Sequence, residues 1–233
     1  MALQKISRFF VLTLFLFFLA SGSSSAIPIW SDYQCLFVED QNQDYLGPGY
    51  GGQSYDVEKL GLSVAGSILY FGLQTGVNII NPAQSGTLQP GDLAFDIGSN
   101  GTWDYGFRFW DSTSSLLAAT SWSDVLYPQH SASNPWRVEE GISISSDYFD
   151  YEKGTGLDAY GNTSYWLEGH IDLAAFGLND FNTFITSNFT MACGNDSGRA
   201  TAAPVPEPAT MLLLGTGMLG LGIFGRKKIK KAA

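Results

Sequence analysis

Short segments in which apolar and polar residues alternate follow one another through the middle of the chain, separated by Gly, Pro, Asn and Asp. The clearest are GSILYFGLQTG (66–76) and SYWLEGHIDL (164–173), where Leu167 and Glu168 fall on opposite faces. An alternation with period two predicts a β-strand with one buried face. Further strands are expected over residues 33–39, 54–64, 93–97, 105–110, 136–138, 142–145 and 188–193.

This succession of segments predicts the fold class. About ten short strands, with no long amphipathic helix and no internal repeat between them, are typical of an antiparallel β-sandwich. Residues 116–122 fit either a strand or a helix, and residues 123–163 have the composition of loops. We therefore expect an all-β sandwich over residues 27–193, followed by a flexible linker over the small and polar stretch 194–203.

The N-terminus has the three-part layout of a secretory signal peptide. Lys5 and Arg8 precede an apolar stretch, and small residues follow it up to Ala26. This is the order of a positively charged region, a hydrophobic helix and a cleavage site. We expect residues 1–26 to be a signal helix that is removed by cleavage after Ala26, with a cut after Gly22 as the less favoured alternative.

A second apolar segment lies near the C-terminus. Its parts are a Pro-Glu-Pro box, an apolar run and a basic cluster, at Pro206, Glu207 and Pro208, at 209–224, and at Arg226, Lys227 and Lys228. Because the prolines cannot continue a helix backwards, the helix is expected to begin after them. It would span roughly 25 Å, slightly less than a hydrocarbon core of about 30 Å. The positive-inside bias places the basic end in the cytoplasm, so we expect one transmembrane helix that stops at these basic residues.

The box, the weak membrane helix and the basic tail together resemble the PEP-CTERM sorting signal, over residues 204–233. The resemblance implies a bacterial protein that is exported, tethered to the inner membrane by its tail and then cut near the box by an exosortase. The expected partners are the secretion machinery, the exosortase and, before processing, the membrane. The expected destination is the cell surface or the extracellular matrix. A plain C-terminal membrane anchor is the alternative.

The charge of the chain between the two signals argues against polyanionic partners. Of the 22 acidic residues only Glu207 lies in a signal, whereas most of the 12 basic residues do. The basic residues that remain are Lys59, Arg108, Arg137, Lys153 and Arg199. A domain with about 16 excess negative charges does not bind nucleic acid or anionic lipid by charge. No nucleic-acid partner is expected, and the charge fits a soluble extracellular domain or one that binds cations.

Two cysteines stand near the ends of the expected domain, Cys35 and Cys193. In an exported chain, an isolated pair more often forms a disulfide than two free thiols. Closing a loop of roughly 160 residues would stabilise the fold by about 4–5 kcal/mol in the chain-entropy model. We therefore expect a Cys35–Cys193 disulfide that joins the first and last strands.

Calcium is the cofactor that this composition suits best, although no spacing matches an EF-hand. Oxygen-rich loops between strands fit a hard cation that takes six to eight oxygen ligands. The glycine-rich segment after the first strand would bring two groups of carboxylates together. The candidate ligands are Glu39, Asp40, Asp44, Asp56 and Glu58. A polar loop without a metal is the alternative.

The sequence contains no standard catalytic motif, whether Gly-x-Ser-x-Gly, His-Glu-x-x-His, a Walker loop or a dinucleotide-binding glycine pattern. The two histidines, His130 and His170, are isolated and typical of surface or structural residues. A pair of carboxylates would suffice for glycoside hydrolysis, but so acidic a chain offers many pairs and the signal is unspecific. The sequence therefore predicts a protein that is not an enzyme.

A second resemblance concerns the domain itself. Segments 69–76 (LYFGLQTG), 90–98 (PGDLAFDIG), 105–110 (YGFRFW) and 168–178 (EGHIDLAAFGL) are similar to the extracellular domains of exosortase-dependent surface proteins. Their order also resembles carbohydrate-binding module family 9 and the DOMON domain, which are sugar- or haem-binding β-sandwiches. The resemblance carries over no ligand residue. Together with the sorting signal it favours a non-catalytic, exopolysaccharide-associated protein. A secreted polysaccharide hydrolase and a purely structural spacer are the alternatives.

Overall fold

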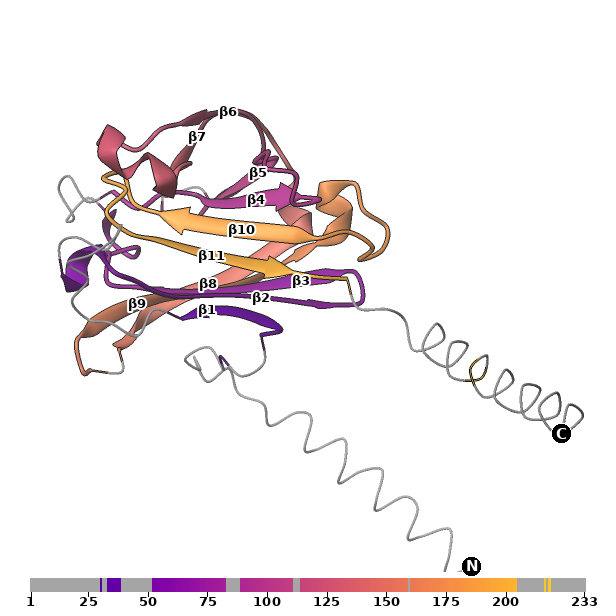
Figure 1. The fold of residues 1–233 in the computed structure, drawn as a ribbon, viewed down its shortest axis with the longest axis horizontal. Coiled ribbons are helices and arrows are strands. Elements are labelled where there is room, and N and C mark those ends of the chain that lie inside the picture. Colours follow the sequence, from indigo (N-terminus) through magenta and orange to yellow (C-terminus); the bar gives the residue numbers. More distant parts are fainter. Residues whose placement is uncertain are drawn as a thin grey trace, which may run out of the picture.

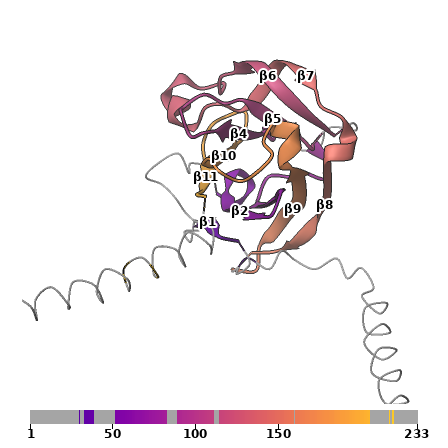
Figure 2. The same ribbon diagram turned by 90° about the vertical axis from the view of Figure 1, so that its right-hand side faces the viewer.

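The computed structural model describes residues 30, 33–38, 52–82, 89–110, 114–158, 160–204, 216 and 218. Their strands form two antiparallel sheets that face each other (Figures 1 and 2). The five-stranded sheet has the order β1 (Cys35–Val38), β2 (Val57–Ala65), β3 (Ile68–Thr75), β9 (Thr163–Asp172) and β8 (Phe149–Leu157). The six-stranded sheet has the order β11 (Ser197–Ala202), β10 (Ile185–Thr190), β4 (Leu93–Ile97), β5 (Tyr105–Arg108), β6 (Ser115–Ser123) and β7 (Arg137–Ser143). The predicted all-β fold of antiparallel sheets is confirmed.

The helical turns of the described residues are short and lie between strands. They are η2 (Gln53–Tyr55), η4 (Pro128–Ser133), η5 (Ser146–Tyr148) and η6 (Leu173–Phe176). At the start of η6 the Asp172 carboxylate accepts the N–H of Ala174 at 2.9 Å, and Gly177 ends the turn with a positive φ of 71°. An acidic cap and a glycine in the left-handed region are what a tight turn of this kind requires.

The core lies between the inner faces of the two sheets. Phe71 of β3, Phe95 of β4, Phe107 of β5 and Phe189 of β10 are all fully buried there. Phe71 meets Phe107 across the interface with ring centroids 5.3 Å apart. Burying one such side chain stabilises the fold by about 1.5–3 kcal/mol. The packing of these rings is therefore a main source of stability and fixes how the sheets face each other.

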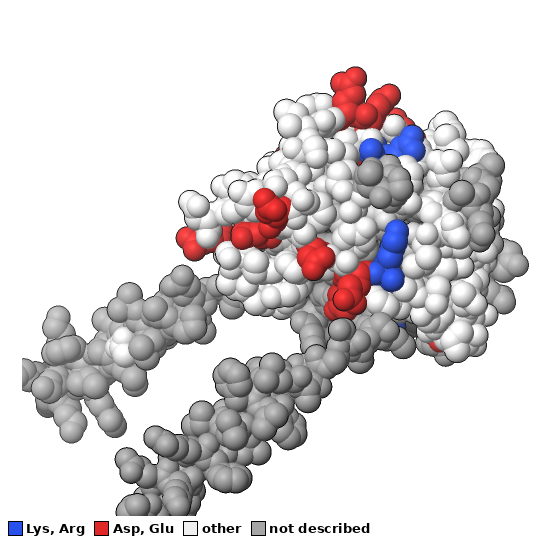
Figure 3. All heavy atoms as spheres, turned by 180° about the vertical axis from the view of Figure 1, so that it is seen from behind, with Lys and Arg blue, Asp and Glu red and all other residues white. Residues whose placement is uncertain are grey.

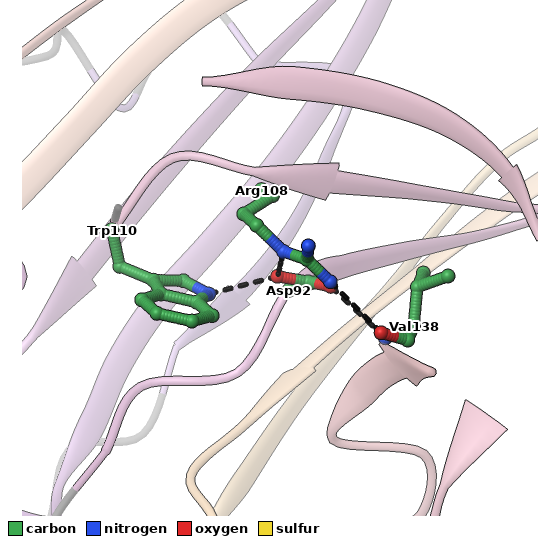
Figure 4. A network of polar contacts seen from close by, with 4 residues as sticks. All are labelled: Asp92, Arg108, Trp110 and Val138. Carbon is green, nitrogen blue, oxygen red and sulfur yellow. Dashed lines mark hydrogen bonds and ion pairs between the residues drawn. The ribbon is translucent and has the colours of Figure 1, made fainter. Parts of the chain in front are cut away.

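A buried carboxylate joins three parts of the six-stranded sheet (Figure 4). Asp92 is fully buried and forms an ion pair with Arg108, at 3.2 Å between Oδ2 and Nη2. The indole of Trp110 donates to Asp92 Oδ1 at 2.8 Å, and the Val138 N–H donates to Oδ2 at 2.9 Å. The Arg108 guanidinium also donates to the Val138 carbonyl at 2.8 Å. Because each carboxylate oxygen has donors, the charge is compensated where water does not reach it.

The predicted flexible linker over 194–203 is wrong, because most of it is β11. This strand pairs with β10 along its whole length and buries Gly198, Ala200 and Ala202 on alternate positions. Before it, the buried Asp196 accepts the Val57 N–H at 2.5 Å and the Ser197 N–H at 2.6 Å. Small side chains read as a linker in the sequence, yet they suit a strand whose inner face packs closely against the other sheet.

The predicted Cys35–Cys193 disulfide is also wrong, since both residues are free thiols. The prediction placed the strand that ends at Cys193 beside the first strand. In the structure β11 contacts β1 instead. Cys35 lies opposite Leu62, about 16 Å along β2 from Val57, the residue bonded to Asp196. A disulfide requires Cα atoms within about 7 Å. The two cysteines accordingly stay unbridged in the structure.

The region 123–163, expected to consist mainly of loops with short strands at 136–138 and 142–145, contains β7 across those two strands and the long β8, which was not expected. In β8 apolar and charged residues alternate, but the glycines at 154 and 156 weaken the pattern. Conversely, the ambiguous residues 116–122 form part of β6. The described residues include no helix that is long and apolar enough to cross a membrane. The expected signal helix (1–26) lies outside the described residues, as does the expected tail helix except for two of its positions.

The Asp92 network gives a first prediction. Asp92→Asn should lower the free energy of unfolding by about 3–5 kcal/mol, because it leaves the Arg108 charge without its buried counter-ion. Urea unfolding of the mature protein measures this. The control is Asp180→Asn in an exposed loop, which should change stability by less than about 0.5 kcal/mol. Equal stability of the two variants would show that the network contributes little.

Candidate functional site

The outer faces of the two sheets differ in what covers them. Over the six-stranded sheet, Asn188 is buried and its amide lies 3.4 Å from the Ser133 carbonyl of η4. The Trp122 ring lies 2.9 Å from the place where a side chain at Gly106 would begin. Other segments of the chain thus cover part of this face. Over the five-stranded sheet the described residues leave an aromatic ring exposed, because Tyr70 is 42% accessible.

Two rows of side chains cross this second outer face, and the strand register places them. In one row Tyr70 of β3 lies opposite His170 of β9, which lies opposite Asp150 of β8. In the next row Glu168 of β9 lies opposite Glu152 of β8. Directly opposed residues on an antiparallel pair have Cβ atoms about 4.5–5.5 Å apart. Three carboxylates, two of them directly opposite each other on neighbouring strands, and an imidazole are therefore gathered in one place.

An open hollow of about 170 Å³ lies among these groups. We call it the outer-face hollow; its lining residues are Asp150, Tyr151, Glu152, Glu168, Gly169 and His170. The Tyr70 ring stands beside it, with its centroid 6.2 Å from that of His170 and the two planes tilted by 46°. The site thus combines one exposed ring with several hydrogen-bonding side chains.

Gly72 lies opposite Glu168, on the side away from Glu152, and Gly61 lies opposite Gly72. Neither glycine has a side chain that would cover the sheet here. A side chain at either glycine would begin 2.6 Å from an atom of Tyr33, so the tyrosine ring needs both positions to be glycine. The Tyr33 hydroxyl donates to Glu168 Oε1 at 3.1 Å. This bond ties the segment before β1 to the hollow and orients one of its carboxylates. Trp30 lies next to Tyr33, and the Lys59 ammonium is 5.3 Å from its ring centroid.

The predicted calcium ligands that the structure describes do not form a cluster. Glu39, Asp40 and Asp44 lie outside the described residues. Glu58 is buried, accepting from Gln53 Nε2 at 2.8 Å and from Ser164 Oγ at 3.2 Å. No group of three or more His, Cys, Asp and Glu residues that suits a metal ion occurs in the described part of the chain. Calcium binding through the full set stays a prediction.

Glu58 has a perturbed acidity. Desolvation by burial raises the pKa of its carboxyl above the ordinary value of 4.5, and the negative charge of Asp158 acts in the same direction. The hydrogen bonds from Gln53 and Ser164 oppose this rise without cancelling it. This buried carboxyl lies near the beginning of β2, where it helps to hold the fold, and it does not face the residues that line the hollow.

The sequence placed some residues of this site and missed others. The alternation of 164–173 put Glu168 and His170 on one face, as found. Asp150 and Glu152 lie in the region 123–163 that the sequence predicts to consist of loops, although the pattern FDYEKGTGL (149–157) alternates and indicates β8. The other histidine, His130, lies in η4 with its ring centroid 6.5 Å from that of Tyr127. The two histidines do not meet in one site.

The comparison with family models identifies the C-terminal segment. Residues 204–228 match the PEP-CTERM protein-sorting motif. The match includes the Pro206-Glu207-Pro208 box and reaches the basic Arg226–Lys228 cluster, both of which lie outside the described residues. The chain thus carries an exosortase sorting signal and is targeted for export and sorting to the cell surface. Neither the curated proteins nor the solved structures contain a match to the chain.

The raised pKa of Glu58 gives a second prediction. The folded protein binds this proton more tightly than the unfolded chain, so the free energy of unfolding should fall as pH rises from about 4.5 through the raised pKa. Glu58→Gln keeps an acceptor for Gln53 but cannot ionise, and it should flatten this fall. Denaturant unfolding at a series of pH values measures both. Glu139→Gln on the exposed part of β7 is the control and should keep the parent's pH dependence.

Proposed function

We propose that this exosortase-sorted surface protein is a non-catalytic, polysaccharide-binding β-sandwich of the extracellular matrix. The observation that supports this most directly is the exposed Tyr70 ring beside the outer-face hollow. A flat ring packs on the apolar face of a pyranose, and polar groups beside it take the hydroxyls. In the hollow these partners are the carboxylates of Asp150, Glu152 and Glu168 and the imidazole of His170.

The position of the hollow fits a long polymer better than a small enclosed ligand. It is open and lies on the face of a sheet, in rows set by the register of β3, β9 and β8. A chain of sugars can cross such a face without having to enter the core. The rigid sheet holds the ring and the carboxylates in place, so little ordering is needed on binding.

The charge of the domain favours an uncharged polysaccharide. Acidic side chains are spread over the side of the molecule seen in Figure 3, with few basic ones between them. A surface of this sign repels uronic-acid polymers and other polyanions at low salt. Neutral hydroxyl groups, in contrast, donate well to carboxylates. Exopolysaccharide with few acidic groups is therefore the proposed ligand.

A hydrolase is the second candidate, and one observation favours it. Glu152 and Glu168 lie directly opposite each other, and glycoside hydrolysis needs two carboxyl groups about 5–10 Å apart. Tyr33 holds Glu168 by a hydrogen bond, as an oriented nucleophile or acid would require. A structural spacer without a ligand is the third candidate, and it predicts that changes in the hollow have no effect on binding.

Tyr70→Ala tests the binding proposal. It should weaken binding to the host's purified exopolysaccharide about ten-fold, or 1.4 kcal/mol, because the stacking surface is lost. Affinity electrophoresis or calorimetry measures this. The matched control is Tyr127→Ala, which removes another half-exposed tyrosine beside a histidine but away from the hollow. An equal loss in both variants, or no binding by the parent, would contradict the proposal.

The hydrolase is distinguished by turnover. The parent protein, incubated with the same polysaccharide and with oligosaccharides, should release no reducing ends. Glu152→Gln and Glu168→Gln should accordingly change affinity alone. Release of sugar by the parent that both variants abolish would replace the proposed function with hydrolysis.

Processing gives a separate prediction. The mature protein should begin at Ile27 and should lack the segment beyond the Pro206-Glu207-Pro208 box, because the two end signals are removed in turn. Intact-mass measurement of the protein from its native host checks both ends. A mass that retains residues 209–233 would leave a membrane-anchored protein in place of a sorted one.

A further inference from the structure

The last strand of the sandwich leads almost directly into the sorting motif. β11 ends at Ala202, and the matched motif begins at Pro204. Even fully extended, the chain from Ala202 to Pro206 spans at most about 14 Å. The prolines favour an extended and fairly stiff segment here. An enzyme that binds the Pro-Glu-Pro box therefore comes within contact distance of the folded domain.

β11 cannot easily lengthen this connection by leaving the sheet. It pairs with β10 from Ser197 to Ala202, and Ala200 and Ala202 are buried between the sheets. At its start the Asp196 carboxylate accepts the N–H groups of Val57 and Ser197. Freeing further residues would break these bonds and expose the buried side chains. The end of the sandwich is thus held close to the box while the domain is folded.

An exposed apolar side chain lies where the chain leaves the domain. Ile185 of β10 lies opposite Ala202, and the preceding residue, Phe184, is 48% exposed. The Phe184 carbonyl accepts the Gly98 N–H at 2.7 Å, and beside it Ser99 bonds to Thr186 at 2.6 Å between their hydroxyl oxygens. These two bonds hold the backbone that carries the ring. In Figure 1 the tip of β11 lies at the same end as the β2–β3 turn and the start of β10.

We propose that this end of the sandwich, formed by Phe184 and the turn 98–100, is a docking surface for the exosortase that processes the chain. The short connection requires the two to meet, and an exposed aromatic ring on a rigid turn is a typical anchor of a protein interface. The guanidinium of Arg199 on β11 lies over the Trp103 ring at 5.2 Å and is engaged there. The acidic domain disfavours an anionic lipid surface as the partner, so the docking partner is the enzyme itself.

The experiment uses the full chain in its native host and follows the rate at which the tail is removed, by pulse-chase and intact mass. Phe184→Ser should slow removal roughly five-fold, the effect of losing about 1 kcal/mol of docking energy. Tyr127→Ser, at a half-exposed ring near the opposite end of β10, should leave the rate unchanged. Thermal unfolding confirms that both variants fold.

A spacer distinguishes docking from any effect on the fold. A Gly-Ser insertion of about twelve residues between Ala203 and Pro204 uncouples the box from the domain. It should lower the rate to that of Phe184→Ser, and adding Phe184→Ser to it should change nothing further. The proposal is overturned if Phe184→Ser leaves the rate unchanged, if its effect persists in full behind the spacer, or if the spacer speeds removal. Binding of the mature domain to anionic vesicles that Phe184→Ser abolishes would overturn it too, in favour of a lipid partner. None of these outcomes depends on polysaccharide binding.

Discussion

The two sheets are held together by the contact of their apolar inner faces, and the other features of the molecule are arranged around this layer. Phe71 and Phe107 meet across it, and Gly169 leaves room there for the Phe71 ring, since a side chain at that position would begin 2.6 Å from its Cζ. Because successive residues of a strand point to opposite faces, the same alternation that turns Leu167 inward turns Glu168 outward. The outer-face hollow is thus the reverse side of the core.

Much of the fold could be predicted from the sequence, since its clearest strands follow a period of two. Residues 66–76 and 164–173 became β3 and β9, which pair with each other. β8 and β11 were missed for a common reason. Their inward positions carry Gly, Ala, Thr or a lysine stem as often as large apolar groups, so burial leaves little hydrophobic signal. Lys153 shows this, because its ammonium donates to the Phe109 carbonyl at 2.7 Å from a partly buried position.

The candidate site was less accessible to prediction than the fold, because register brings its residues together. Alternation alone placed Glu168 and His170 on one face, but their partners Glu152 and Asp150 come from β8, and nothing local states which residues of β8 lie opposite them. The contact of Tyr33 with Glu168 joins positions 135 residues apart. The sorting signal is the opposite case. All its parts are contiguous, so the sequence alone revealed the motif that the family model matches over residues 204–228.

The tyrosine that lies over Gly61 and Gly72 links three positions in a way that sequence variation should reveal. A methyl group at either glycine would begin 2.6 Å from the ring, so neither can become alanine while position 33 stays aromatic and in place. If residue 33 becomes small, however, no ring prevents a larger residue at position 61 or 72. In an alignment of related chains, an aromatic residue at 33 should therefore coincide with glycine at 61 and 72, and the three positions should change together.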